Sequence, residues 1–157
     1  MRFNAPWGRE LTVLTTIVTM TMVVAMVVTW RRGARFIPAL LLCIHALPLI
    51  MSVRGYELVP GALVVRRLWW TTRWPLNGPV KAALRPNVMA RSWRILGNGG
   101  VFAFSGTFSN AALGRYRAFV TDLKRTVVLD TPRGIVVVSP DRPEDFVAAV
   151  QRVAGPR

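Results

Sequence analysis

Two long apolar runs separated by five residues open the chain, and they constrain its fold more than any other feature. Residues 11–30 contain no charged side chain, and residues 36–53 form a second run of eighteen residues without acid, lysine or arginine. A helix rises about 1.5 Å per residue, so each run reaches roughly 27–30 Å, close to the thickness of the hydrocarbon core of a bilayer. The joint is too short to be a domain. We therefore predict that residues 1–54 form a transmembrane helical hairpin.

Aromatic and basic residues mark the ends of these runs, as expected for spans that stop at the headgroups. The span-end anchors that we assign are Trp7, Trp30, Arg31, Arg32 and Arg35. A cleaved secretory signal is the alternative for the first run. We reject it because the run exceeds the usual 7–15 apolar residues of a signal and because a second run follows at once.

Two polar features inside the runs leave alternatives open. His45 is the single histidine of the chain and has no acidic partner in either run, so we favour a neutral, hydrogen-bonded packing residue over a proton relay. Threonines recur at helical spacing from Thr12 to Thr19. They either pack against the second helix or form a surface for self-association.

The orientation of the hairpin depends on where the basic residues lie. The joint holds three arginines, and the other side holds six near the span ends: Arg2, Arg9, Arg54, Arg66, Arg67 and Arg73. Under the positive-inside rule this count places both termini in the cytoplasm, although the density of arginine in the joint argues for the reverse. We expect the part of the chain after the hairpin to be cytoplasmic.

Residues 55–157 change to the short alternating pattern of strands. Residues 56–59 and 62–66 flank a Pro-Gly turn, and further strands are expected at residues 68–74, 115–121, 126–130 and 135–138, with residues 115–121 paired to 126–130. A short helix fits residues 80–84. The apolar stripe after Asp141, which we take as a capping residue, predicts a C-terminal helix at about residues 142–154 that ends at Gly155. The fold class is α+β, mainly β.

Several segments resemble a known family. They are Tyr56-Glu57-Leu58 with Gly61 and Leu63-Val64-Val65, then the segment 114–122, then residues 127–131, and then Ile135-Val136-Val137-Val138-Ser139-Pro140-Asp141-Arg142-Pro143-Glu144-Asp145-Phe146. Together with the hairpin, they resemble the membrane-anchored bacterial pleckstrin-homology (PH-like) domains. The resemblance implies a bent β-barrel of about seven strands closed by the C-terminal helix, in a multi-pass protein of the bacterial inner membrane. It supplies no catalytic residues.

The chain offers little for catalysis. Cys43 is the single cysteine and lies in the second run, so neither a disulfide within the chain nor a cysteine metal site is possible. The glycine-rich residues 97–100 are not followed by the Gly-Lys-Ser/Thr of a phosphate-binding loop, so we take them as a turn. We expect no enzyme activity, no cofactor and no metal.

A tract without acidic residues is the strongest candidate for a binding surface. Residues 58–121 contain no Asp or Glu, nine basic residues and four tryptophans, in a chain of net charge +14. Basic groups near an anionic leaflet gain about 1 kcal/mol each, and tryptophan favours the headgroup level. The candidate contacts with membrane lipid are Arg66, Arg67, Trp69, Trp70, Arg73, Trp74, Arg91, Trp93 and Arg94. Alternation along a strand at residues 66–70 would place one arginine and one tryptophan on each face, so we expect Trp69 or Trp70 to lie in the core. A merely solvated face is the alternative for the arginines.

Two hypotheses follow. In the first, the hairpin holds a small β-domain over the headgroups, where the domain binds anionic lipid or a partner protein. In the second, the chain is a structural subunit of a membrane complex or a homo-oligomer. Nucleic acid is a rival partner for a basic, aromatic surface, but the tether to a membrane already explains the charge and no nucleic-acid motif is present.

Overall fold

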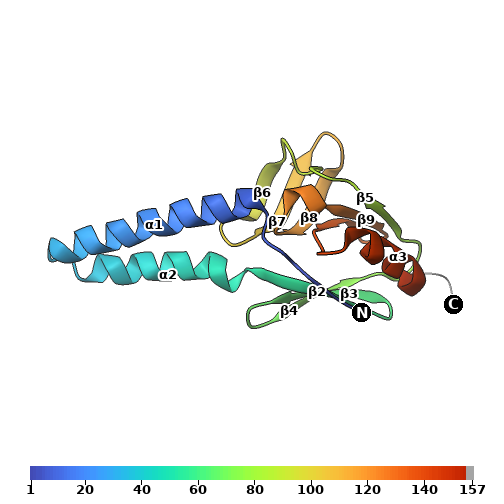
Figure 1. Cartoon of the computed structure of the whole chain (residues 1–157), viewed down its shortest axis with the longest axis horizontal. Helices are drawn as coiled ribbons and strands as arrows, with labels where there is room; N and C mark the ends of the chain where they lie inside the picture. Colours follow the sequence, from blue (N-terminus) through green and yellow to red (C-terminus); the bar gives the residue numbers. More distant parts are fainter. Residues whose placement is uncertain (155–157) are drawn as a thin grey trace.

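Two long helices project from one end of a β-rich domain in a computed structural model, which describes residues 1–154 (Figure 1). Helix α1 spans Arg9–Arg31 and helix α2 spans Phe36–Ile50. Of the described helices, α1 alone has the length and apolar composition to cross a membrane. The second helix is shorter than the predicted 36–53, because Val53 is buried at the start of the following strand.

The domain contains two sheets over the described residues. The first has the order β1(Arg2–Asn4), β2(Val53–Val59), β3(Ala62–Arg67) and β4(Thr71–Pro75). The second has the order β5(Lys81–Leu84), β9(Val127–Thr131), β10(Gly134–Val138), β8(Gly114–Val120), β7(Phe104–Asn110) and β6(Trp93–Gly99). A 3₁₀ turn covers Leu123–Arg125, and helix α3 covers Pro143–Ala154, as predicted. Gly155, the predicted end of that helix, lies outside the described residues. The sheets remain open, with free edges at β1, β4, β5 and β6, so the expected closed barrel is not formed.

The chain begins with a strand that the sequence analysis placed in the helical hairpin. Strand β1 pairs antiparallel with β2, with Phe3 opposite Tyr56, and the Phe3 side chain is only 6% exposed. The Asp141 carboxylate accepts hydrogen bonds from the backbone and side-chain nitrogens of Asn4, both at 3.2 Å. Asp141 therefore fastens β1, and its carboxylate also accepts from the Arg142 N–H just before α3 begins. Residues 2–4 belong structurally to the β-domain.

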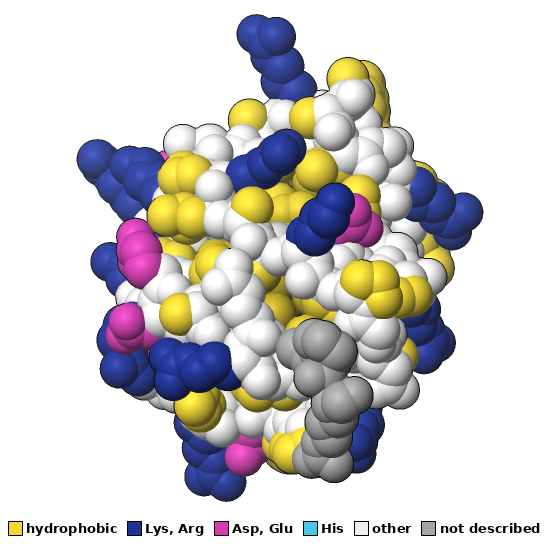
Figure 2. Space-filling model, turned by 90° about the vertical axis from the view of Figure 1, so that its right-hand side faces the viewer, with side chains coloured by type: hydrophobic (Ala, Val, Ile, Leu, Met, Phe, Trp, Pro, Cys, Tyr) yellow, Lys and Arg dark blue, Asp and Glu magenta, His cyan; other side chains and the backbone are white. Residues whose placement is uncertain are grey.

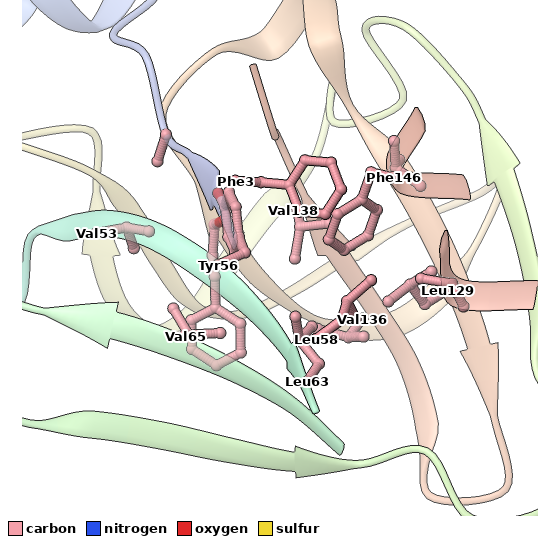
Figure 3. Packing of buried hydrophobic residues seen from close by; sticks show 14 of the residues in the cluster. Phe3, Val53, Tyr56, Leu58, Leu63, Val65, Leu129, Val136, Val138 and Phe146 are labelled. Atoms are coloured by element: carbon pink, nitrogen blue, oxygen red, sulfur yellow. The ribbon is translucent and has the colours of Figure 1, made fainter. Parts of the chain in front are cut away.

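Both sheets and α3 share one core (Figure 3). The rings of Phe3 and Phe146 meet edge to face at 5.0 Å, and Val136 and Val138 of β10 lie beside them. The fully buried Tyr56 hydroxyl donates a 2.6 Å hydrogen bond to the Phe119 carbonyl oxygen and accepts one of 3.1 Å from the Ser139 N–H. This hydroxyl joins the first sheet to the second.

Three local predictions about the second sheet are wrong. Residues 80–84 do not form a helix, because residues 81–84 pair with β9 as the edge strand β5. The strands at 114–120 and 127–131 do not pair with each other, because β10 lies between them, antiparallel to β9 and parallel to β8. Gly97 and Gly99 lie within β6 rather than in a turn.

Candidate membrane-facing surface

The base of α1 is fixed to the domain before the helix becomes exposed. The Gly8 N–H donates to the Thr121 carbonyl oxygen and the Thr121 hydroxyl donates to the Pro6 carbonyl oxygen, both at 2.8 Å. Leu11 and Thr15 are 1% and 4% exposed. One face of the first turns of α1 therefore packs against the domain, whereas Val13 and Leu14 on the outer face are 49% and 38% exposed.

Phe102, in the loop between β6 and β7, wedges between the two helices. Its ring lies 6.0 Å from the Trp7 ring and 5.3 Å from the His45 ring, and its N–H donates to the Thr15 hydroxyl at 3.0 Å. The Thr19 hydroxyl and the His45 Nε2 are 3.1 Å apart, which agrees with the hydrogen-bonded packing role expected of His45. This contact couples the orientation of the hairpin to that of the domain.

The largest exposed apolar side chains of the β-domain lie on two elements. Trp69 and Trp70, in the turn between β3 and β4, are 74% and 42% exposed, and in β6 Trp93 is 81%, Ile95 52% and Leu96 70% exposed. The prediction that Trp69 or Trp70 lies in the core is therefore wrong, because the strand expected at residues 68–74 begins only at Thr71. Figure 1 shows that β6 and the β3–β4 turn both lie at the end of the domain from which α1 and α2 project. We call these five side chains, together with Arg94, the hairpin-side surface.

Basic side chains without acidic partners accompany this surface. Arg66, Arg73, Arg91 and Arg94 are exposed. Over residues 1–154 the ion pairs are Arg2–Glu57, Arg125–Asp122 and Arg142–Asp145, so none of these four arginines is neutralised by a carboxylate. At the opposite end of the molecule, acidic side chains show at several places among the basic ones (Figure 2). The hairpin-side surface is thus suited to anions.

Two of the predicted lipid contacts are engaged within the domain. Arg67 donates from Nε to the Thr72 hydroxyl at 3.0 Å and from Nη1 to the Met51 carbonyl oxygen at 2.6 Å. Burial, with a further contribution from the charge of Arg117, lowers the pKa of Arg67. Trp74 is half-buried and donates from Nε1 to the Thr131 hydroxyl at 3.2 Å, so Trp74 is a tryptophan packed against the core. Arg67 and Trp74 therefore serve mainly to hold the fold.

The span-end anchors divide between the two ends of the hairpin. Trp30 is 61% exposed near the end of α1, and the three arginines of the joint, Arg31, Arg32 and Arg35, are exposed at its tip. Trp7 lies at the other end, 45% exposed and packed on Phe102. This arrangement places basic and aromatic side chains at both ends of the apolar helices.

A cleft of about 300 Å³, which the sequence did not predict, lies beside β6. It is lined by Met89, Ser92, Arg94, Gly99, Phe104, Phe108 and Leu123. These residues come from separate segments that only the second sheet brings together, so no local pattern in the sequence marks the cleft. Among the described residues no group of His, Cys, Asp and Glu side chains is arranged to hold a metal ion.

Comparisons with known proteins bear on the domain rather than on the hairpin. Residues 54–154 match the model of a family described as the bacterial PH domain. No curated protein and no solved structure matches the chain.

Proposed function

Because the chain belongs to the bacterial PH domain family, we propose that it is a non-enzymatic integral membrane protein whose PH-like domain binds anionic lipid headgroups at the bilayer surface. The hairpin supplies the anchor and the hairpin-side surface supplies the contact. The observation that carries this proposal is the set of exposed arginines without carboxylate partners beside exposed tryptophans, at the end of the domain where the apolar helices begin.

Arg91 and Arg94 flank Trp93 and form the centre of the proposed headgroup site. Each basic group near an anionic membrane surface contributes about 1 kcal/mol, and the attraction is screened by salt. Arg94 also lines the cleft beside β6. A phosphate bound at these two arginines would leave its acyl chains beside the apolar side chains of β6.

The test uses the full chain in an uncharged detergent, titrated with short-chain phosphatidylglycerol or with short-chain phosphatidylcholine while tryptophan fluorescence is recorded. We expect tighter binding of phosphatidylglycerol, weakening as salt rises. The double substitution Arg91→Gln with Arg94→Gln removes about 2 kcal/mol, which is roughly a thirty-fold loss of affinity. Arg152→Gln, in α3, is the matched control and leaves the affinity unchanged. Equal binding of the two lipids would refute the proposal.

We also propose that the domain lies in the cytoplasm of a bacterial cell, with the protein in the inner membrane. The count of basic residues on the domain side of the hairpin supports this orientation. The pairing of β1 with β2 supports a location of both hairpin ends on one side of the membrane.

A structural role in a membrane complex or homo-oligomer is the second candidate. The observation in its favour is the free edge of β6, because an unpaired edge strand with apolar side chains can accept a strand from another chain. The threonines of α1 give it less support. Thr15 and Thr19 contact Phe102 and His45 within the chain, and the Thr12 hydroxyl donates to the Gly8 carbonyl oxygen.

A further inference from the structure

The exposed part of the hairpin is shorter than the hydrocarbon core of a bilayer. The outer face of α1 is exposed from Val13 to Trp30, a stretch of 18 residues, and α2 has 15 residues, none of them buried. At about 1.5 Å per residue these stretches reach about 27 Å in α1 and about 22 Å in α2, against a hydrocarbon thickness of about 30 Å. Helix α2 therefore falls about 8 Å short of this thickness, and the exposed face of α1 about 3 Å.

No flexible linker separates the domain from the two helices, so the domain cannot move away from the membrane. Strand β2 begins at Val53, three residues after α2 ends at Ile50. On the other side, Gly8 is hydrogen-bonded to Thr121 and Phe102 is wedged between the helices. The depth of the hairpin in the bilayer therefore fixes the depth of the domain.

We propose that the domain makes up this shortfall itself: β6 and the β3–β4 turn are immersed in the interfacial layer of the bilayer and form a second anchor beside the hairpin. The inference rests on the proposed membrane anchoring, but it does not depend on lipid charge. Trp69, Trp93 and Leu96 are each at least 70% exposed, and neither β6 nor the β3–β4 turn contains an acidic residue. Bilayers stabilise tryptophan at this level irrespective of headgroup charge.

Lipid, rather than a protein, covers the hairpin-side surface because this surface continues the exposed apolar face of α1. A Cβ atom on Gly100 would lie 2.9 Å from Leu14 of α1 and 2.8 Å from the Phe104 ring of β7. The loop that follows β6 is thus in contact with the exposed helix, where Leu14 is 38% exposed. A lipid that covers Leu14 lies next to this loop and to β6.

The backbone of β6 sets the limit of immersion. This strand pairs only with β7, so the N–H and C=O groups of its outer edge have no partner in the sheet. In hydrocarbon each unpaired group would cost several kcal/mol, whereas water at the headgroups satisfies it. Immersion therefore stops at the interface, where Arg94 can extend its guanidinium toward the phosphates.

The experiment places an environment-sensitive nitrobenzoxadiazole (NBD) probe on single cysteines of the full chain, reconstituted in phosphatidylcholine vesicles. Native Cys43, which is exposed on α2, reports the hairpin. In a Cys43→Ala background, Leu96→Cys and Trp69→Cys report the second anchor, and Arg152→Cys is the control on α3. Lipids brominated near the glycerol or deep in the acyl chain quench the probe according to its depth.

We expect a clear loss of fluorescence at Leu96→Cys and Trp69→Cys with shallow bromines, a smaller loss with deep bromines, and none at Arg152→Cys. Quenching at Leu96→Cys no greater than at Arg152→Cys, with Cys43 quenched, overturns the second anchor alone and favours a protein partner for this surface. If lipids brominated deep in the acyl chain quench the probe at Leu96→Cys more than lipids brominated near the glycerol, the claim that β6 lies at the interface is overturned. An unquenched Cys43 overturns membrane anchoring, and with it both proposals.

Discussion

The Tyr56 hydroxyl joins the two sheets, so Tyr56→Phe tests how the domain is held together. This substitution leaves the ring in place beside Phe146, 6.2 Å away, and removes only the O–H group. The hydroxyl is fully buried, donates to the Phe119 carbonyl oxygen in β8 and accepts from the Ser139 N–H. Both partners lose a hydrogen bond in a place that water does not reach.

The expected loss follows from these two groups. A buried polar group left without its partner costs about 1–3 kcal/mol, so two such groups should lower the free energy of unfolding by about 2–6 kcal/mol. In a domain of about 100 residues, 1 kcal/mol shifts the melting temperature by about 4–8 °C. The effect should therefore be large on a thermal scan as well as in urea.

The pH dependence gives a second, independent signature. Burial raises the pKa of Tyr56 from 10.0 to about 12, against smaller opposing effects of the hydrogen bonds to Ser139 and Thr121. Above pH 10 the unfolded chain releases this proton while the folded chain keeps it, so stability falls as pH rises from 10 to 12. At about 1.4 kcal/mol per pH unit the loss approaches 3 kcal/mol, and Tyr56→Phe abolishes it.

The assay is urea unfolding of the full chain in an uncharged detergent at pH 8, 10, 11 and 12, followed by tryptophan fluorescence. Wild type and Tyr56→Phe differ only in one hydroxyl group, so the difference in stability between them isolates Tyr56. Tyr116→Phe is the control: the Tyr116 side chain is also buried and burial also raises its pKa, but its hydroxyl donates to Ser92 at 2.7 Å and joins no second sheet. Equal loss of stability in wild type and Tyr56→Phe between pH 10 and pH 12 would refute the reasoning.

Two further predictions concern β6 and the orientation of the hairpin. Gly106→Ala should separate β6 from β7, because a Cβ there would lie 2.1 Å from the Leu96 carbonyl oxygen. We expect a loss of more than about 2 kcal/mol in the same urea assay, against about 1 kcal/mol for Gly114→Ala, whose Cβ meets nothing within 4 Å. For orientation, a membrane-impermeant maleimide should label Arg32→Cys but not Arg133→Cys on intact bacterial cells, in a Cys43→Ala background. The reverse pattern would place the domain outside.

The elements that the sequence predicts well are those with a long or self-contained pattern. The apolar run of α1, the Pro60-Gly61 turn between β2 and β3 and the amphipathic stripe of α3 each determine local structure without help from distant residues. Strand β1 has three residues and a partner more than fifty positions away, so no local signal marks it. Strand β5 contains two alanines, and alanine by itself favours a helix. The segment is a strand because it pairs with the distant strand β9.

The candidate site divides in the same way. Composition alone finds the tract that is rich in arginine and tryptophan and free of acid, but it does not separate outward-facing Trp69 and Trp93 from Trp74, which packs on the core. That separation depends on where each strand lies in its sheet. The sequence did not predict the role of Phe102, because this role depends on its backbone φ angle of +63° and on contacts with helices that are far from it in the sequence.

The pairing of β1 with β2 makes the helical hairpin an insertion within a β-hairpin. Asn4 lies opposite Gly55, so residues 5–54 occupy the place of a turn that elsewhere needs two to five residues. A cut after α2 that released the helices would also remove β1, with Phe3, from the core, so the helices cannot be lost without exposing the edge of β2. A short turn from Asn4 to Gly55 would instead keep β1 in place and yield a helix-free domain for crystallisation or NMR, at the cost of uncovering Phe102.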